Sequence, residues 1–430
     1  PIFMYHGFQY LEIELSSPDI RIEDIHANVI HTDFERAGGF SSSNALLDEI
    51  YDVTLNTFLT NYHGYPTDCP HREKIGWTGD GQLVMDFGLF NFHSATAYEK
   101  WVDDMQDEQR PNGQVPGIIP TSGWGYGIGY GPDPHGYRGA GYGPQWEGVC
   151  ISLPWTLYQN TGDIQTLESR YPMMKAYHGY LNTWSEDGVL RIGIDDHKWI
   201  RMQTQAPVIA TAYHYHLAGL LEKTARVLGR ESDIAQFKSD QTKIKSAFNR
   251  EFLDAATGVY DNGSQTSQAL ALAFDLVPDD ARQAVVDRLV ESILEQDKHP
   301  IAGVVGVRAM VDALPKIGRS DLLYAMATQT EMPSWGWWLK QGATTLWQNW
   351  DGSQSRNHVM FGSINDFFYE NLAGIQLDPE SPGYKHFLVK PDFIAELDQA
   401  SAWHEGPHGR IRSSWKRDGG KLALSVQVPP

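Results

Sequence analysis

The chain has 430 residues and an ordinary globular composition, which is enough to bury a large core in about two or three domains. Its net charge of −20 argues against nucleic acid and anionic membranes as partners, because both would repel it. No run of about 18 apolar residues occurs, so we expect a soluble protein without a transmembrane helix.

Metal and thiol chemistry are weakly represented. The two cysteines, Cys69 and Cys150, are too few for a disulfide scaffold and lack metal-site spacing. Carboxylates beside Cys69 raise a thiol pKa, which argues against a nucleophilic role. The histidines are scattered, so we expect no metal and no cofactor. The first residues lack the basic and apolar regions of a signal peptide, and both ends read as interrupted strands, which suggests a piece of a longer protein.

The first 36 residues contain stretches that alternate with a period of two. Gln9-Tyr-Leu-Glu-Ile-Glu-Leu15 is one of them, and such alternation is expected of strands. We therefore predict that residues 1–36 are the end of a preceding β domain and a linker. From Ser41 the period changes, and apolar residues between 45 and 62 follow the spacing of one helical face.

The stretch Asp68-Cys-Pro-His-Arg-Glu-Lys-Ile-Gly-Trp-Thr-Gly-Asp80 follows this helix. It holds three carboxylates with an arginine among them, while its prolines and glycines oppose a helix. Site residues concentrate on loops held by rigid structure. A cation can keep one carboxylate ionised while a neighbour's pKa rises toward that of a general acid. A solvated, charged surface loop is the alternative. The candidate residues are Asp68, Arg72, Glu73, Trp77 and Asp80.

Helical periodicity recurs along most of the remaining chain, without the strand–helix alternation of a parallel sheet. About a dozen helices in near-even pairs predict a mainly α fold, an (α/α)6 toroid or barrel over residues 37–380, whose inner loops line a pocket. A helical array without a pocket is the alternative. The predicted helices after the first cover 81–90, 97–109, 151–160, 164–184, 207–228, 234–252, 265–276, 281–295, 304–314, 321–328 and 361–373.

Alternation returns near Tyr384. Segments 386–390, 409–415 and 422–428 read as strands, with turn signals at Asp418-Gly-Gly420. We expect residues 381–430 to begin a C-terminal β-sandwich, so that β segments flank the helical domain.

Aromatic residues gather in two glycine-rich stretches, 123–131 and Trp335-Gly-Trp-Trp338. Rings presented by loops are platforms for flat apolar faces such as those of sugars. The second stretch continues toward His358, which could be a base or a hydrogen-bonded loop histidine. Its tryptophans exceed what helix packing needs, and its candidates are Trp335, Trp347, Gln348 and His358.

Another charged stretch, Asp195-Asp-His-Lys-Trp199, is followed by Arg201. It is either an ion-pair cluster or a set of ligands for sugar hydroxyls, with Lys198 and Arg201 as its cations. Glycosidic cleavage needs an acid for the leaving oxygen and usually a second carboxylate across the sugar. The loop 68–80 offers acids of this kind.

The motif of residues 68–80 resembles the signature of the bacterial α-L-rhamnosidases of glycoside hydrolase family seventy-eight. The resemblance extends over nearly the whole chain. Its shorter motifs are Tyr5-His-Gly-Phe-Gln-Tyr-Leu11, Leu153-Pro-Trp-Thr-Leu-Tyr158, Gly342-Ala-Thr-Thr-Leu-Trp347, Asn357-His-Val-Met-Phe-Gly362 and Pro382-Gly-Tyr-Lys-His386.

The resemblance implies a six-fold α/α barrel flanked by β domains and inverting hydrolysis of terminal non-reducing α-L-rhamnosides. The partners would be oligosaccharides or polysaccharide side chains that bear terminal L-rhamnose, in the bacterial periplasm or cytoplasm. In the family pattern Glu73 is the general acid, Asp68 and Asp80 grip the sugar, and Arg72 and Trp77 belong to the same shell. The family's general-base Glu falls on Gln348.

This departure leaves several explanations open, because an amide cannot take a proton from water. The chain is a deliberate Glu-to-Gln variant, or another carboxylate such as Asp351 is the base. Alternatively, the protein is a relative that cleaves rhamnose–glucuronate linkages by β-elimination, or an inactive sugar-binding relative. Elimination needs a base, such as His358 or a tyrosine, and a cation for the uronate carboxylate. The candidate cations are Lys198, Arg201 and Arg356.

Overall fold

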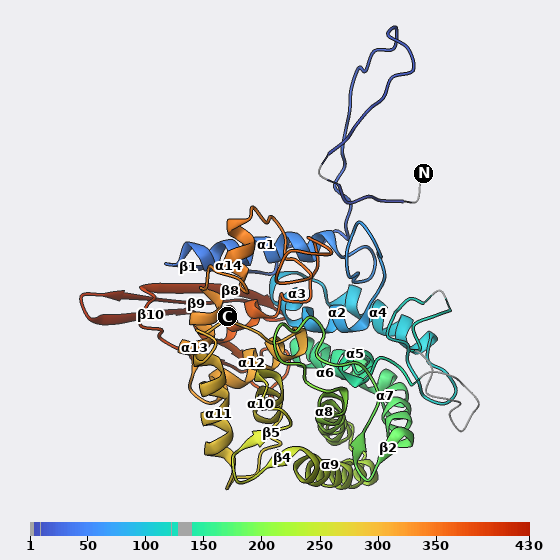
Figure 1. The fold of residues 1–430 in the computed structure, drawn as a ribbon, viewed down its shortest axis with the longest axis vertical. Helices are drawn as coiled ribbons and strands as arrows, with labels where there is room; N and C mark the ends of the chain where they lie inside the picture. The colour runs from blue at the N-terminus through green and yellow to red at the C-terminus, as the bar shows by residue number, and fades with distance from the viewer. Residues whose placement is uncertain (1–3, 9, 122, 128–139) are drawn as a thin grey trace.

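The computed structural model describes residues 4–8, 10–121, 123–127 and 140–430. Its described part is a helical body with an antiparallel sheet on one side and an extended arm at the N-terminus (Figure 1). The described helices are α1 (Ala45–Thr60), α2 (Thr78–Leu83), α3 (Met85–Asn91), α4 (Ala95–Asp107), α5 (Pro144–Glu147), α6 (Val149–Thr161), α7 (Ile164–Trp184), α8 (Ala206–Val227), α9 (Glu231–Phe252), α10 (Gln265–Ala273), α11 (Arg282–Leu294), α12 (Val304–Lys316), α13 (Ser320–Ala327), α14 (Trp335–Lys340), α15 (Ile364–Phe367) and the π-helix η1 (Phe368–Leu372).

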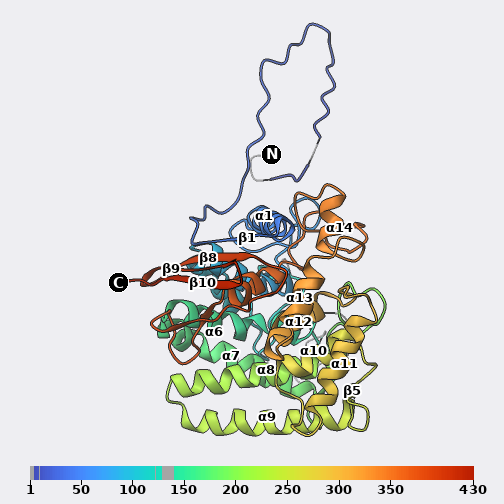
Figure 2. The same ribbon diagram turned by 90° about the vertical axis from the view of Figure 1, so that its left-hand side faces the viewer.

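The long helices pack in pairs with an inner and an outer member. α8 is buried on most sides, whereas its partner α9 buries one stripe that includes Ile234, Phe237 and Phe248. A helix that is apolar all round belongs in an interior, and an amphipathic one covers it from outside. α9 lies outside α8 at the edge of the body (Figure 2). The predicted mainly helical fold of paired helices is confirmed.

The largest sheet joins a strand that directly precedes α1 to the three last strands of the chain. Its antiparallel strands are β1 (Gly38–Ser42), β8 (Gln399–Gly406), β9 (Gly409–Asp418) and β10 (Lys421–Gln427), in that order. Three two-stranded sheets pair β2 (Ser185–Glu186) with β3 (Val189–Leu190), β4 (Leu253–Asp254) with β5 (Val259–Tyr260), and β6 (Ile375–Leu377) with β7 (Phe387–Val389). β1 and β8 were not predicted, since β8 is rich in Ala, Gly and polar residues and lacks β-branched ones.

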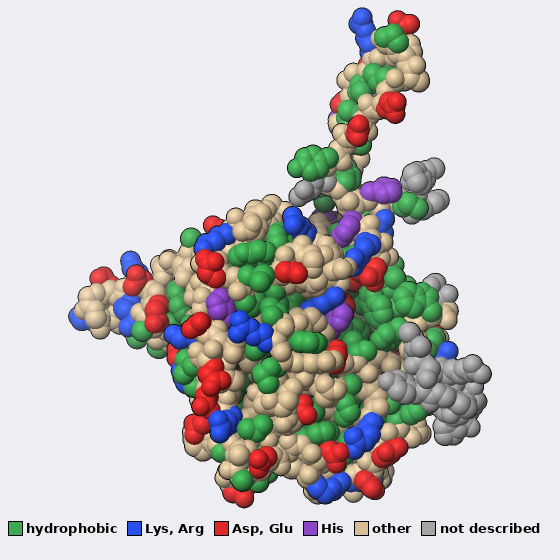
Figure 3. All heavy atoms as spheres, in the orientation of Figure 1, with side chains coloured by type: hydrophobic (Ala, Val, Ile, Leu, Met, Phe, Trp, Pro, Cys, Tyr) green, Lys and Arg blue, Asp and Glu red, His purple; other side chains and the backbone are tan. Residues whose placement is uncertain are grey.

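Two sequence predictions were wrong. Among the described residues, 10–15 form no strand and belong to an arm that leaves the body. Tyr10 and Leu11 are exposed there, and Figure 3 shows hydrophobic side chains along the arm. A strand needs a neighbour for its backbone groups, and this arm has none in the described chain. Residues 335–338 were read as a loop but begin helix α14, whose first turn is capped by Ser334.

The aromatic stretch 123–131 is only partly visible, because residues 128–131 lie outside the described residues, as does Gln9. The helix predicted over 361–373 is instead divided into α15 and η1. In the described chain, no helix has both the length and the apolar character needed to cross a bilayer.

Candidate active site

A cavity of about 470 Å³ lies where the loops before α2, α8 and α15 meet. Its wall is mainly polar and aromatic. The lining residues are Asp68, Arg72, Glu73, Trp77, Asp80, Tyr142, Trp146, Ile194, Asp195, His197, Lys198, Gln348, Gln354, His358 and Met360.

The loop 68–76 is closed at its base by two hydrogen bonds. The backbone N–H of Asp68 donates to the Ile75 carbonyl at 3.0 Å, and the Ile75 N–H donates to Oδ1 of Asp68 at 2.9 Å. Gly76 then passes so close to Ile119 that an added Cβ would lie 1.9 Å from its carbonyl oxygen. The closed loop holds Arg72 and Glu73 at its tip, against the cavity.

Glu73 is held by a ring and by a cation. Its Oε2 accepts a hydrogen bond of 2.9 Å from the indole of Trp77, and its Oε1 lies 3.5 Å from a guanidinium nitrogen of Arg72. The Trp77 ring meets Tyr142 edge to face, with centroids 5.0 Å apart. The glutamate side chain remains about one-third exposed, at 35%. It is therefore fixed in direction and still accessible from the cavity.

Arg72 also reaches the far wall of the cavity. The nitrogen that approaches Glu73, Nη2, donates a 3.1 Å hydrogen bond to Oε1 of Gln348, and Nη1 donates to Gln354 at 2.6 Å. Oε1 of Gln348 also accepts from the backbone N–H of Ser355 at 3.1 Å. The amide is thus oriented with its oxygen toward donors, and a single guanidinium links the two positions at which the resemblance places acid and base.

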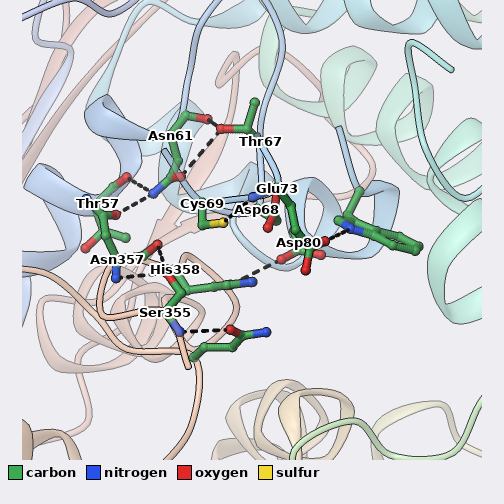
Figure 4. A network of polar contacts seen from close by, with 12 residues as sticks. Thr57, Asn61, Thr67, Asp68, Cys69, Glu73, Asp80, Ser355, Asn357 and His358 are labelled. Atoms are coloured by element: carbon green, nitrogen blue, oxygen red, sulfur yellow. Dashed lines mark hydrogen bonds and ion pairs between the residues drawn. The ribbon is translucent and has the colours of Figure 1, made fainter. Parts of the chain in front are cut away.

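Two further carboxylates are buried beside Glu73, and Figure 4 shows Asp68, Glu73 and Asp80 gathered with His358 directed toward them. Burial raises the pKa of Asp68 to about 6. Burial, with the nearby carboxylates, raises the pKa of Asp80 well above its ordinary value. Burial also lowers the pKa of His358 well below its usual range, and its Nδ1 lies 3.3 Å from Oδ1 of Asp80. Both shifts favour the uncharged forms of Asp80 and His358.

A polar network ties the loop that carries Gln348 and His358 to the end of α1 (Figure 4). Asn61 donates to Oδ1 of Asn357 at 2.6 Å, and its carbonyl accepts from the Thr67 N–H at 2.7 Å. Oγ of Ser355 donates to the Asn357 carbonyl at 2.9 Å. Since Thr67 directly precedes Asp68, this network holds the two loops at a fixed separation.

Asp196 anchors the loop between β3 and α8. It is fully buried, and its carboxylate accepts from the Thr266 hydroxyl and from the backbone N–H groups of Gly303, Val305 and Gly306 at the start of α12. Such a carboxylate compensates the partial positive charge of a helix N-terminus. Burial nevertheless raises its pKa to about 6. The next two residues, His197 and Lys198, are thereby placed on the cavity wall.

The aromatic floor of the cavity rests on another buried acid. Glu147 accepts from the backbone N–H of Tyr142 at 2.6 Å and from the Tyr177 hydroxyl at 3.2 Å. Burial raises its pKa to about 8. Trp146, its neighbour on α5, meets the His197 ring edge to face. Glu147 therefore orders Tyr142 and Trp146 without itself lining the cavity.

Two protein-family models match the chain. A family model of the bacterial alpha-L-rhamnosidase six-hairpin glycosidase domain matches residues 35–372, and one of the bacterial alpha-L-rhamnosidase C-terminal domain matches residues 374–430. The chain belongs to the bacterial α-L-rhamnosidase family. Its predicted (α/α)6 barrel agrees with the structures of that family that it resembles.

Several bacterial α-L-rhamnosidases are similar over the whole chain. A protein of that name from Formosa agariphila is 30% identical over 455 residues, which is 100% of this chain and 47% of its own length. The solved α-L-rhamnosidase from Dictyoglumus thermophilum superposes with a TM-score of 0.86 and 32% identity, covering 93% of this chain and 45% of that one. The Streptomyces avermitilis enzyme complexed with L-rhamnose gives a TM-score of 0.85 and 30% identity, over 93% and 38%. The chain spans about half the length of these α-L-rhamnosidases.

The structure brings together most of the residues predicted from the sequence. Asp68, Arg72, Glu73, Trp77, Asp80, Lys198, Gln348 and His358 line the cavity of this α-L-rhamnosidase family member. Trp335, Trp347 and Arg201 are not among its lining residues. Trp335 and Trp347 are 2% and 3% exposed and pack in an aromatic core, so the density of tryptophans there serves packing. Arg201 donates instead to Gln296.

Sequence reasoning missed part of the wall that surrounds the rhamnosidase motif. Tyr142, Trp146, Ile194, Gln354 and Met360 line the cavity as well. The sequence does place Trp146 directly before an acidic residue, Glu147, but it does not show that this acid is buried. The alternative base Asp351 does not line the cavity, and its carboxylate accepts from the N–H and hydroxyl of Ser353. In the described part of the chain, no three His, Cys, Asp or Glu side chains converge to hold a metal ion.

Proposed function

We propose that the chain is the catalytic part of an enzyme that hydrolyses terminal non-reducing α-L-rhamnosides with inversion. Its substrates would be oligosaccharides or polysaccharide side chains that end in L-rhamnose. The names of the similar proteins and the L-rhamnose bound to the Streptomyces avermitilis enzyme support this. The observation that carries it is Glu73 on the cavity wall, oriented by Trp77 and Arg72.

Glu73 would act as the general acid. Protonating the glycosidic oxygen requires a carboxylic acid that is held in direction and open to the substrate. The 2.9 Å bond from Trp77 supplies the direction, and the partial exposure of Glu73 supplies the access. The buried Asp68 and Asp80 would accept hydrogen bonds from sugar hydroxyls or donate to them, and Trp77, Tyr142 and Trp146 would pack against the apolar face of the ring.

The division of the chain belongs to the same proposal. Residues 1–36 would end a preceding domain, 37–380 would form the catalytic barrel, and 381–430 would begin the C-terminal β domain. The two family-model ranges, 35–372 and 374–430, support this division.

Gln348 favours a second candidate, β-elimination at a rhamnose–glucuronate linkage, because this reaction needs no activated water. Of the three cations considered for a uronate carboxylate, Lys198 lines the cavity. Arg356 lies over the Trp347 ring at 4.6 Å, and Arg201 is bonded to Gln296. The base for elimination would be His358 or a tyrosine. Burial lowers the pKa of His358, which weakens it for this role, and burial raises the pKa of the cavity residue Tyr142, which disfavours its phenolate form. Hydrolysis therefore has the stronger support.

The product and the leaving-group dependence test the proposal. The chain should release free L-rhamnose from 4-nitrophenyl α-L-rhamnoside, and no unsaturated uronate should form from a rhamnosyl-glucuronate substrate. Glu73→Gln should lower kcat/KM by about 10³-fold for an alkyl rhamnoside and much less for a 2,4-dinitrophenyl one, because a good leaving group needs no acid. An equal loss on both substrates would contradict the role of Glu73. Binding of rhamnose without either product would identify a sugar-binding relative.

A further inference from the structure

The proposed inverting hydrolysis still lacks a general base. Inversion requires a base that takes a proton from the attacking water, and the Gln348 amide cannot do so. In the part of the chain that the structure describes, four acidic side chains line the cavity: Asp68, Glu73, Asp80 and Asp195. With Glu73 as the acid, the base must be sought among the other three.

Asp68 and Asp80 are poorly suited to this role. Asp68 belongs to the same loop as Glu73 and Asp80 to helix α2 directly after it, and both are nearly fully buried, at 1% and 3% exposure. Oδ1 of Asp68 is already bonded to the Ile75 N–H, and Oδ1 of Asp80 faces the His358 imidazole. Burial and the neighbouring carboxylates also raise the pKa of Asp80 well above its ordinary value, which favours its protonated form.

Each cavity histidine would become a buried cation near Lys198 on taking up a proton, whereas a carboxylate would become neutral. Burial lowers the pKa of His197 to about 4 and that of His358 well below its ordinary value, and the nearby Lys198 acts in the same direction on both. Lys198 itself is a cation, although burial and the neighbouring Arg72 lower its pKa. None of the three is therefore as well suited as a carboxylate to take a proton from water.

Asp195 comes from a different segment of the cavity lining, the loop between β3 and α8. It is partly exposed, and its Oδ2 accepts a hydrogen bond from the Gln203 amide. The residues on both sides are fixed. Ile194 donates its N–H to the Tyr142 carbonyl at 3.1 Å and accepts from Gln145 at 2.8 Å, and Asp196 is locked to the start of α12. The Asp195 carboxylate is therefore held in place on rigid neighbours while it remains reachable by water.

We propose that Asp195 is the general base of this enzyme, in place of the glutamate that Gln348 replaces. This assignment rests on the proposed hydrolysis. A water oxygen forms the new bond to rhamnose C1 while Asp195 takes one of its protons. The C1–O bond to the aglycone breaks, its electron pair goes to the aglycone oxygen, and Glu73 protonates that oxygen. The products are β-L-rhamnose and the free alcohol, and both carboxyl groups return to their starting state by exchange with solvent.

The test compares the unmodified chain with three variants on 4-nitrophenyl α-L-rhamnoside. Asp195→Asn should lower kcat by at least about 100-fold. Adding Gln348→Glu to that variant should recover at least about tenfold, because it restores a carboxylate at the family's usual position. Asp351→Asn is the matched control, since Asp351 does not line the cavity, and should stay within about twofold of the unmodified chain.

Rescue by azide distinguishes a general base from a residue that has only a structural role. It attacks C1 without losing a proton, so it should accelerate Asp195→Asn at least about tenfold and yield β-L-rhamnosyl azide. An Asp195→Asn variant with nearly full activity would overturn the assignment, as would a folded, inactive one that neither azide nor Gln348→Glu rescues. If the unmodified chain is active in those cases, the proposed hydrolysis stands and only the role of Asp195 as general base is contradicted. An unmodified chain that releases no rhamnose overturns both.

Discussion

The indole Nε1 of Trp77 donates a hydrogen bond of 2.9 Å to Oε2 of Glu73. The two residues are four apart in the chain, yet the loop between them is not helical, and Trp77 is the residue before α2 begins. The start of a helix therefore orients a carboxylate on the loop that leads into it. Because the bond fixes the side chain of the inferred acid, its loss is expected to affect catalysis more than folding.

Trp77→Phe should lower kcat/KM for an aryl rhamnoside by roughly tenfold, the equivalent of about 1.4 kcal/mol, because the net contribution of a hydrogen bond is about 0.5–1.5 kcal/mol. The phenylalanine ring can still pack against Tyr142. Trp124→Phe is the control, since Trp124 contacts the Trp77 ring but lies one ring further from Glu73. Steady-state kinetics on both variants are the measurement, and equal losses would show that ring packing, not the hydrogen bond, matters.

Gly79→Ala should displace the aromatic floor of the cavity. A Cβ at Gly79 would lie 2.3 Å from the Trp146 ring, so the ring or the backbone of α2 must move. Overpacking of this kind costs about 1–3 kcal/mol, and we expect KM to rise several-fold together with a lower melting temperature. Gly179→Ala, within α7, has open space around its Cβ and should be neutral or stabilising by about 0.5–1 kcal/mol. A Gly79→Ala variant with unchanged KM would contradict the placement of Trp146.

Glu147→Gln should change how stability depends on pH. Burial raises the pKa of Glu147 from 4.5 to about 8, so the folded protein holds a proton that the unfolded chain releases in that range. The free energy of unfolding therefore falls as pH rises, by about 1.4 kcal/mol per pH unit from this group. Glutamine cannot titrate, and it can keep the bond from the Tyr142 N–H. The variant should gain stability relative to the unmodified chain between pH 4.5 and about 8.

Urea unfolding followed by tryptophan fluorescence at several pH values measures this difference. Glu331→Gln is the control, because that side chain is 77% exposed and forms a surface ion pair with Lys340. For the control, the plot of unfolding free energy against pH should run parallel to that of the unmodified chain. A parallel curve for Glu147→Gln would mean that Glu147 is not protonated in the folded protein.

The helical body and the acid loop could be read from the sequence because both are local patterns. α7 covers the predicted range, Ile164–Trp184, since helical periodicity over many residues leaves little ambiguity. Asp68, Arg72, Glu73 and Asp80 lie within one short segment, and such a segment keeps its residues together in any fold. The identity of residue 348 as an amide was equally plain from the sequence.

Only the tertiary structure determined which residues that are distant in the sequence come into contact. β1 pairs with β8, about 360 positions later, and no local pattern records such a partner. Trp335 and Trp347 had the composition of a sugar platform but pack in the core, because burial depends on neighbours that the sequence does not name. In the same way Arg72 meets Gln348, and Asp195 reaches the cavity of Glu73, through loops placed by separate helices. Periodicity determines which elements form, whereas the packing of their buried faces determines which of their loops share a site.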